Sequence, residues 1–129
     1  MKVSLYVISI VFLWQVIVAC SANLPKQGGK PTIVGLQKNI ANLVSDKSCD
    51  NGKQCQSIAY GAKACGGPTH YLIYSLKNID AVKLSSEVKQ YNQLMKEDNR
   101  RSGRISNCSI LIPPTLMCRD NQCVATRSR

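Results

Sequence analysis

Seven cysteines give this sequence most of its chemical potential, because a thiol can form a bridge, ligate a metal, act as a nucleophile or carry a lipid. Cys20 follows an apolar N-terminal run, and the other six cysteines lie further along the chain. If the apolar run is an export signal, Cys20 is either lipidated or removed with it, so six cysteines remain in the exported chain. Six cysteines in an oxidising compartment predict three disulfides, for which 15 pairings are possible. The predicted disulfide-forming residues are Cys49, Cys55, Cys65, Cys108, Cys118 and Cys123.

The spacing of these cysteines argues against a metal or redox centre. Zinc sites favour close cysteine pairs, often with histidines, and redox centres favour Cys-x-x-Cys. Five residues separate Cys49 from Cys55, four separate Cys118 from Cys123, and the sequence contains no Cys-x-x-Cys. The single histidine, His70, is far from a matching pair. We therefore predict no metal site and no cofactor.

The other polar side chains form no catalytic motif. His70 stands beside no G-x-S-x-G nucleophile and no orienting acid. The acidic residues fit structural roles, such as Asp50 and Asp120 in turns and Asp80 as a helix N-cap. We predict a protein without enzymatic activity, in which His70 lies at the surface beside a turn.

A short glycine turn is the first candidate recognition element. Gly66, Gly67 and Pro68 follow Cys65 and indicate a sharp chain reversal, because glycine permits positive φ and proline stops strand pairing. Rigid turns at the surface present ligand-binding groups well. We therefore take Gly66, Gly67, Pro68 and His70 as a candidate recognition loop.

Positive charge provides the second candidate. The sequence has 17 basic and 7 acidic residues, which gives a net charge of +10. Most lysines are spread out, but Arg100, Arg101 and Arg104 form a cluster that we predict to bind an anionic lipid or glycan. Glu97 is spaced to form an i, i+4 ion pair with Arg101. Nucleic acid is not expected, because neither aromatic platforms nor a groove-reading helix accompanies the charge.

The N-terminus has the layout of an export signal. Met1 and Lys2 precede an apolar run over residues 3–19 that contains no charge, and the chain then becomes polar. A transmembrane helix is the alternative, but a span needs about 20 apolar residues, and this run is slightly short and has no basic flank on its far side. We predict that residues 1–19 are a secretory signal peptide.

The stretch Ile17–Cys20 at the end of this run resembles the lipobox of bacterial lipoproteins. The resemblance implies cleavage before Cys20, lipidation of its thiol and stable anchoring in a membrane. With Ser21 in the next position, it also implies the outer membrane of a Gram-negative cell, with the protein facing the periplasm or the cell surface. The alternative is cleavage after Ala22, which would release a soluble secreted protein.

Two helices are expected downstream of the signal. Residues 20–31 are rich in glycine, proline and lysine and read as a flexible tether behind the lipidated cysteine. Apolar residues at helical spacing then indicate an amphipathic helix over residues 32–45, with Thr32 as its N-cap. The same spacing indicates a longer helix over residues 80–101, which Gly103 would end.

Runs of β-branched, aromatic and aliphatic residues indicate the strands. The fold class that we predict is α+β, with two helices packed on a short antiparallel sheet and the whole held by disulfides. It forms a single domain over residues 32–129. The predicted strands cover residues 56–60, 71–74 and 109–112, and a hairpin covers residues 116–125.

The chain carries the pattern C-x₅-C-x₉-C-G-G-P-x-x-Y-L-x-Y-S from residue 49 and C-x₉-C-x₄-C from residue 108. This pattern is similar to small cysteine-rich envelope proteins of Gram-negative bacteria, a resemblance that implies a fold and a compartment and no active site. We predict a non-catalytic envelope lipoprotein that binds an anionic envelope component or another protein, or that has a structural role. The alternative is a secreted effector or a secreted inhibitor of a protease or lysozyme, presenting residues 65–68 or 118–123.

Overall fold

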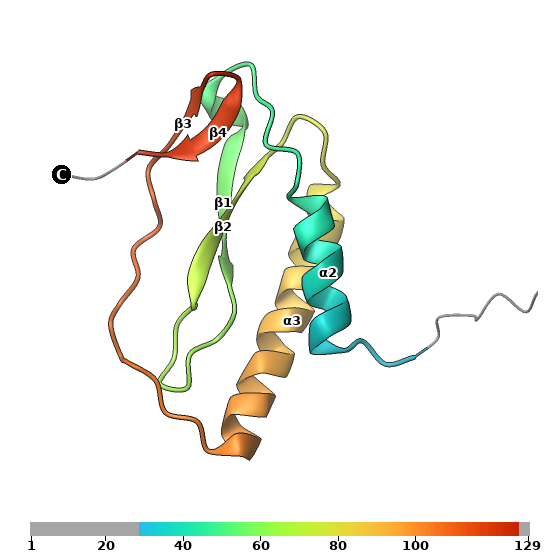
Figure 1. Cartoon of the computed structure of the whole chain (residues 1–129), viewed down its shortest axis with the longest axis vertical. Helices are drawn as coiled ribbons and strands as arrows, with labels where there is room; N and C mark the ends of the chain where they lie inside the picture. Colours follow the sequence, from blue (N-terminus) through green and yellow to red (C-terminus); the bar gives the residue numbers. More distant parts are fainter. Residues whose placement is uncertain (1–28, 127–129) are drawn as a thin grey trace, which may run out of the picture. The chain divides into compact units, whose positions relative to one another are not determined.

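The computed structural model describes residues 29–126 of the chain. The predicted signal peptide over residues 1–19 and the predicted lipidation site, Cys20, lie outside the described residues. The described part has the element order α2, η1, β1, β2, α3, β3, β4, which is the predicted α+β class (Figure 1). Neither of its two helices is long and apolar enough to cross a membrane.

The strands β1 (Cys55–Tyr60) and β2 (His70–Ser75) form an antiparallel hairpin. Its register pairs Cys55 with Ser75 at one end and Tyr60 with His70 at the other. Aromatic and aliphatic residues dominate its middle, and such residues suit a pleated, half-buried surface. Both strands contain the predicted ranges and are slightly longer.

The strands β3 (Leu116–Arg119) and β4 (Gln122–Ala125) form a second antiparallel hairpin, as predicted. Its turn residues, Asp120 and Asn121, have φ angles of 52° and 58°. Asp and Asn tolerate this left-handed region better than other side chains, which explains the turn at this point. The two hairpins are separate two-stranded sheets, whereas the sequence predicts one sheet. The Cys55–Cys123 disulfide, rather than a shared ladder, joins β1 to β4.

The two helices α2 (Ile33–Leu43) and α3 (Ala81–Ser102) match the predicted ranges closely. Each begins at a side chain that accepts a backbone N–H three residues further on, at 3.0 Å for Thr32 and 2.9 Å for Asp80. Helix α3 ends at Gly103, which has a left-handed conformation.

The main core lies between the two helices and the β1–β2 hairpin. Ile40 of α2 and Leu84 of α3 are fully buried in it. Tyr91 of α3 stacks on Tyr60 of β1 with ring centroids 4.3 Å apart. This packing fixes the end of β1 against the middle of α3, and with it the start of the loop that follows β1.

Residues 104–115, which we call the strap, run from the end of α3 back to β3 without regular structure (Figure 1). The strand predicted over residues 109–112 is therefore wrong. It has no ladder partner among residues 29–126, and Pro113 and Pro114 lack the N–H groups that a strand needs to pair. Three isoleucines of the strap point outward instead. Ile105, Ile110 and Ile112 are 98%, 91% and 82% exposed.

Candidate functional site

Two disulfides close one end of the domain. They join Cys49 to Cys118 and Cys55 to Cys123. Three of these four cysteines are buried, and their sulfurs form the one group of described side chains with metal-ligand spacing. Because both bridges consume these sulfurs, we assign the group to stapling. Cys65 and Cys108, the remaining cysteines of the predicted set, are exposed free thiols in the structure, so the third bridge stays a prediction.

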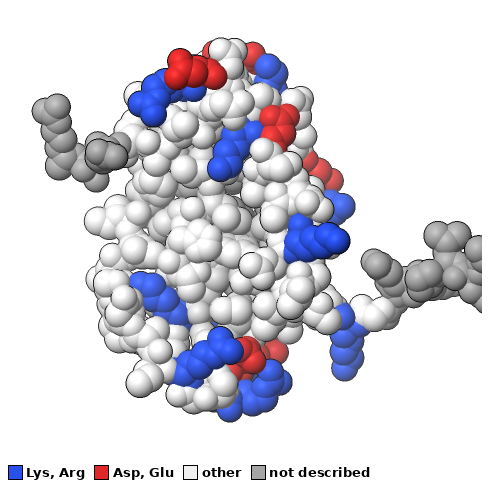
Figure 2. Space-filling model, in the orientation of Figure 1, with Lys and Arg blue, Asp and Glu red and all other residues white. Residues whose placement is uncertain are grey.

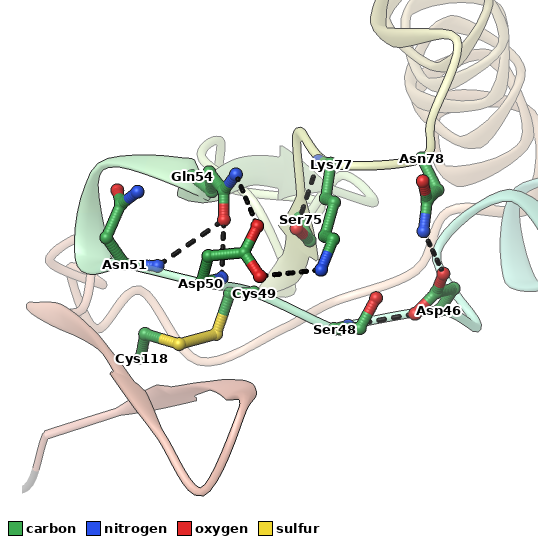
Figure 3. A network of polar contacts seen from close by, with 10 residues as sticks. All are labelled: Asp46, Ser48, Cys49, Asp50, Asn51, Gln54, Ser75, Lys77, Asn78 and Cys118. Carbon is green, nitrogen blue, oxygen red and sulfur yellow. Dashed lines mark hydrogen bonds and ion pairs between the residues drawn. A yellow bond between two sulfur atoms is a disulfide. The ribbon is translucent and has the colours of Figure 1, made fainter.

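We call this end the stapled end. It comprises residues 46–55, which include η1 (Gly52–Gln54), and the β3–β4 hairpin. Short polar contacts reinforce it (Figure 3). Lys77 forms a 2.7 Å ion pair with Asp50, and Gln54 bonds the same carboxylate. These contacts lower the pKa of Asp50, the Lys77 bond most strongly. The carboxylate is thus already satisfied within the chain, and the network acts as a brace rather than as a ligand site.

The opposite end carries the candidate site, an open hollow of ≈ 520 Å³ between the β1–β2 loop and the C-terminal end of α3. We call it the basic hollow. Four basic side chains line it, and no carboxylate, hydroxyl or imidazole is among the described residues that line it. Amines and guanidinium groups without an acid or a nucleophile suit the binding of an anion and give no catalytic set. The basic residues are Lys63, Lys96, Arg100 and Arg104.

Two asparagines of α3 hold the loop wall of the basic hollow. Asn92 accepts the Gly61 N–H at 2.7 Å and donates to the Ala59 carbonyl at 3.0 Å. Asn99 is buried and donates to the Ala62 carbonyl at 2.7 Å. Neither residue is among the candidates predicted from the sequence. The signal was available, because the apolar stripe of α3 extended by helical spacing reaches position 99, where a polar side chain must find a partner.

The arginine cluster is partly neutralised within the chain. Asp98 forms ion pairs with Arg101 at 2.9 Å and with Arg104 at 3.0 Å. The predicted Glu97–Arg101 pair is wrong, since the i, i+3 partner Asp98 takes its place and Glu97 accepts a bond from Gln93 instead.

Arg100 is the member of the cluster that makes no ion pair in the described part of the chain. With Lys96, it lines both the basic hollow and a neighbouring hollow of ≈ 560 Å³ along α3. Figure 2 shows blue side chains gathered around red at the lower end of this face, over the end of α3. Cations at a helix C-terminus are favoured by the macrodipole alone. That preference does not explain Lys63, which comes from the β1–β2 loop.

The glycine turn predicted for recognition forms part of the same hollow. Gly66 and Gly67 have φ angles of 102° and 78°, a region that glycine alone adopts readily, and both line the basic hollow. His70 is exposed and lies apart from the hollow lining, with its ring edge-on to Tyr60 at 5.0 Å. The structure thus brings Gly66 and Gly67 of the predicted recognition loop together with Arg100 of the predicted arginine cluster in one hollow. His70 lies outside this hollow.

The β3–β4 hairpin, the other loop proposed for an inhibitor, is engaged with its own chain. The Asn121 carbonyl in its turn accepts the Cys49 N–H at 3.0 Å. Ser48 also bridges to Gln122 beside the turn. Backbone groups tied up in this way are not free to pair with a protease, so the hairpin offers less than the basic hollow.

Comparisons with known proteins identify no relative. No protein-family model matches the chain, and neither a curated protein nor a solved structure is significantly similar to it.

Proposed function

We propose that this protein is a non-catalytic envelope lipoprotein whose basic hollow binds phosphate-bearing anions at a membrane surface. The observation that carries the proposal is the convergence of four cations from two distant chain segments on one open hollow. Lysine and arginine are the side chains that recognise phosphate, and Lys96 and Arg100 have no carboxylate partner in the described residues.

The strap favours a lipid source for the anion over a soluble one. Ile105 is almost fully exposed and directly follows Arg104, which lines the basic hollow. Ile110 follows Ser109, whose carbonyl accepts a 2.6 Å bond from Lys63. Exposed apolar side chains beside basic ones are typical of surfaces that lie in a membrane interface. A free phosphate or a glycan would use the cations and leave the isoleucines in water.

The anchor predicted at Cys20 agrees with this location and needs its own test. The intact mass of protein extracted from membranes should match a chain that begins at Cys20 and carries acyl groups. An unmodified chain that begins at Asn23 would end the lipoprotein part of the proposal and leave a soluble secreted protein.

Binding is best tested with a chain that lacks the acyl groups, because these would attach it to any vesicle. The variant Cys20→Ala gives residues 20–22 the small-residue pattern of ordinary signal cleavage, so it should be exported and released. We expect this chain to bind phosphatidylglycerol vesicles and not phosphatidylcholine vesicles. In that background, Lys96→Gln with Arg100→Gln should weaken binding about 30-fold, since each basic residue near an anionic surface contributes about 1 kcal/mol.

The matched control is Lys38→Gln with Lys47→Gln, which removes the same charge from two exposed positions outside the hollow. An equal loss of binding in this control would show that net charge, rather than the basic hollow, is responsible. Ile105→Ser with Ile110→Ser separates the sources of the anion. If the anion belongs to a lipid surface, the isoleucine variant should bind vesicles more weakly, while inorganic phosphate or heparin should compete with its vesicle binding as well as with that of the parent. If the anion belongs to a glycan, the isoleucine changes should have no effect.

A further inference from the structure

The two free thiols of the structure meet at one carbonyl group. The sulfur of Cys65 lies 3.8 Å from the Ser106 carbonyl oxygen, and the sulfur of Cys108 lies 3.9 Å from the same atom. Cys65 comes from the β1–β2 loop and Cys108 from the strap, so two segments far apart in sequence deliver one thiol each to one place.

Other contacts hold the strap against the loop on both sides of Cys108. The Cys65 N–H donates to the Ser106 hydroxyl at 3.4 Å, and its thiol donates to the Asn107 carbonyl at 3.3 Å. Beyond Cys108, the Lys63 ammonium donates to the Ser109 carbonyl at 2.6 Å. Such contacts confine both thiols, so forming a bond between them would cost less conformational entropy.

The environment also divides the roles of the two thiols. A hydrogen bond between them lowers the pKa of Cys65, with help from the Ser106 hydroxyl, and raises the pKa of Cys108. Both thiols are exposed, whereas three of the four stapling cysteines are buried. Cys65 therefore has the stronger thiolate character and the access that attack on a disulfide requires.

We propose that Cys65 and Cys108 form a third, exchangeable disulfide that locks the strap to the glycine turn. The oxidant is a small disulfide such as oxidised glutathione. The Cys65 thiolate attacks one of its sulfurs, forms a mixed disulfide and releases one glutathione thiolate. The Cys108 thiolate then attacks the Cys65 sulfur, forms the bridge and releases the second glutathione thiolate. The two protons lost by the cysteines end on the two released thiols, so one disulfide replaces another.

This bridge differs in kind from the two staples. Cys49–Cys118 and Cys55–Cys123 are mostly buried, so reductants reach them poorly, whereas the Cys65 and Cys108 thiols are exposed. The bridge would lie next to Gly66 and four residues after Arg104, both of which line the basic hollow. The inference concerns the covalent state of the chain and stands or falls independently of what the hollow binds.

Peptide mapping of the exported full chain tests the pairing directly. The protein is incubated with oxidised glutathione, its remaining thiols are blocked with iodoacetamide, and it is digested with trypsin without reduction. The sequence places Cys65 in peptide 64–77 and puts both Cys108 and Cys118 in peptide 105–119. We expect one three-peptide species made of 48–53, 105–119 and 64–77, and one two-peptide species made of 54–63 and 120–127. Reduced glutathione should release 64–77 first and leave 48–53 attached to 105–119.

Several outcomes would overturn the proposal. They are an alkylated or glutathione-bearing 64–77 peptide after full oxidation, its linkage to any peptide other than 105–119, and release of 48–53 before 64–77. The variants Cys65→Ser and Cys108→Ser provide the control, since each should leave the partner cysteine linked to no other peptide, either as a glutathione mixed disulfide or as an alkylated thiol, while both staples persist. Because the staples hold the fold at the other end, these exposed substitutions test the chemistry without unfolding the domain.

Discussion

The stapled end and the basic end lie at opposite ends of the domain (Figure 1). The basic end comprises the β1–β2 loop and the last two turns of α3, and the two ends keep their shapes by different means. At the stapled end, one disulfide joins the two hairpins, the other joins β3 to Cys49 in the segment before β1, and the carboxylates of Asp46 and Asp50 are paired with donors of the same chain. At the basic end, the asparagine side chains of α3 fix the loop, and Lys96 and Arg100 remain without a carboxylate partner in the described residues.

This contrast separates stability from recognition. An end whose polar groups are already satisfied has little left to offer a ligand, whereas unpaired cations close together raise the energy of the free protein and are relieved by an anion. The basic end can carry that cost because the covalent bonds of the stapled end stabilise the whole domain. The proposed Cys65–Cys108 bridge would add a covalent link at the basic end as well.

Loss of the staples should produce the largest effect. Their sequence separations are 69 and 68, so both close almost the same long loop. In the chain-entropy account, one such loop contributes about 4 kcal/mol, and the second bridge closes a remaining ring of about 13 residues worth about 3 kcal/mol. Either alanine pair, Cys49→Ala with Cys118→Ala or Cys55→Ala with Cys123→Ala, should therefore cost about 3 kcal/mol, and both pairs together should unfold the domain.

Urea unfolding measures this effect as a change in midpoint at constant slope. The matched control is Cys65→Ala with Cys108→Ala, compared with the parent while these two thiols are reduced. Because both residues are exposed and unbridged in that state, the control should change stability by less than about 0.5 kcal/mol. If it costs as much as a staple pair, the two ends do not differ in the way described.

A smaller effect is expected from the asparagine that holds the basic end. Asn99→Ala removes the donor to the buried Ala62 carbonyl, and an unsatisfied buried acceptor costs about 1–3 kcal/mol. Asn39→Ala on the exposed face of α2 is the control and should change stability little. Hydrogen exchange should show faster opening of the β1–β2 loop in the Asn99 variant and unchanged protection in the β3–β4 hairpin. Equal loosening of both ends would contradict their independence.

Much of the fold could be predicted because its signals are local. Thr32 and Asp80 cap their helices through side chains that reach only three residues along the chain, and Asp120-Asn121 fixes the hairpin turn by its own backbone preference. Each signal needs no knowledge of the rest of the chain. The helices and the strands of both hairpins accordingly lie where the sequence places them.

The parts that the sequence could not supply depend on distant neighbours. An aliphatic run such as residues 109–112 becomes a strand only if another strand edge pairs with it, and neither sheet of the described residues includes the strap. The cysteine pairing depends on which segments meet, so spacing alone left 15 choices open. The basic hollow combines Gly66 with Arg100, and only the packing of β1 on α3 shows that these residues line one site.

The smallest expected effect concerns acid stability at the stapled end. Hydrogen bonds from the Asn78 side chain and from Ser48 lower the pKa of Asp46 from 3.8 to about 2. A carboxyl group whose pKa is lower in the folded state stabilises the fold above its unfolded pKa, and that contribution disappears as the pH falls through the folded value. The thermal unfolding midpoint should therefore decrease as the pH is lowered from about 4 to about 2.

Asn78→Ala isolates this contribution, because it removes the largest cause of the shift and leaves the Asp46 carboxyl in place. The variant should be less stable at pH 7 and should lose less stability than the parent on acidification. A decrease in stability as steep as that of the parent would show that another group governs the loss of stability in acid.

Added salt sharpens the contrast between the ends. A short hydrogen bond at the stapled end persists at 0.5 M salt (roughly a 4 Å screening length), while anion binding at the basic hollow is screened.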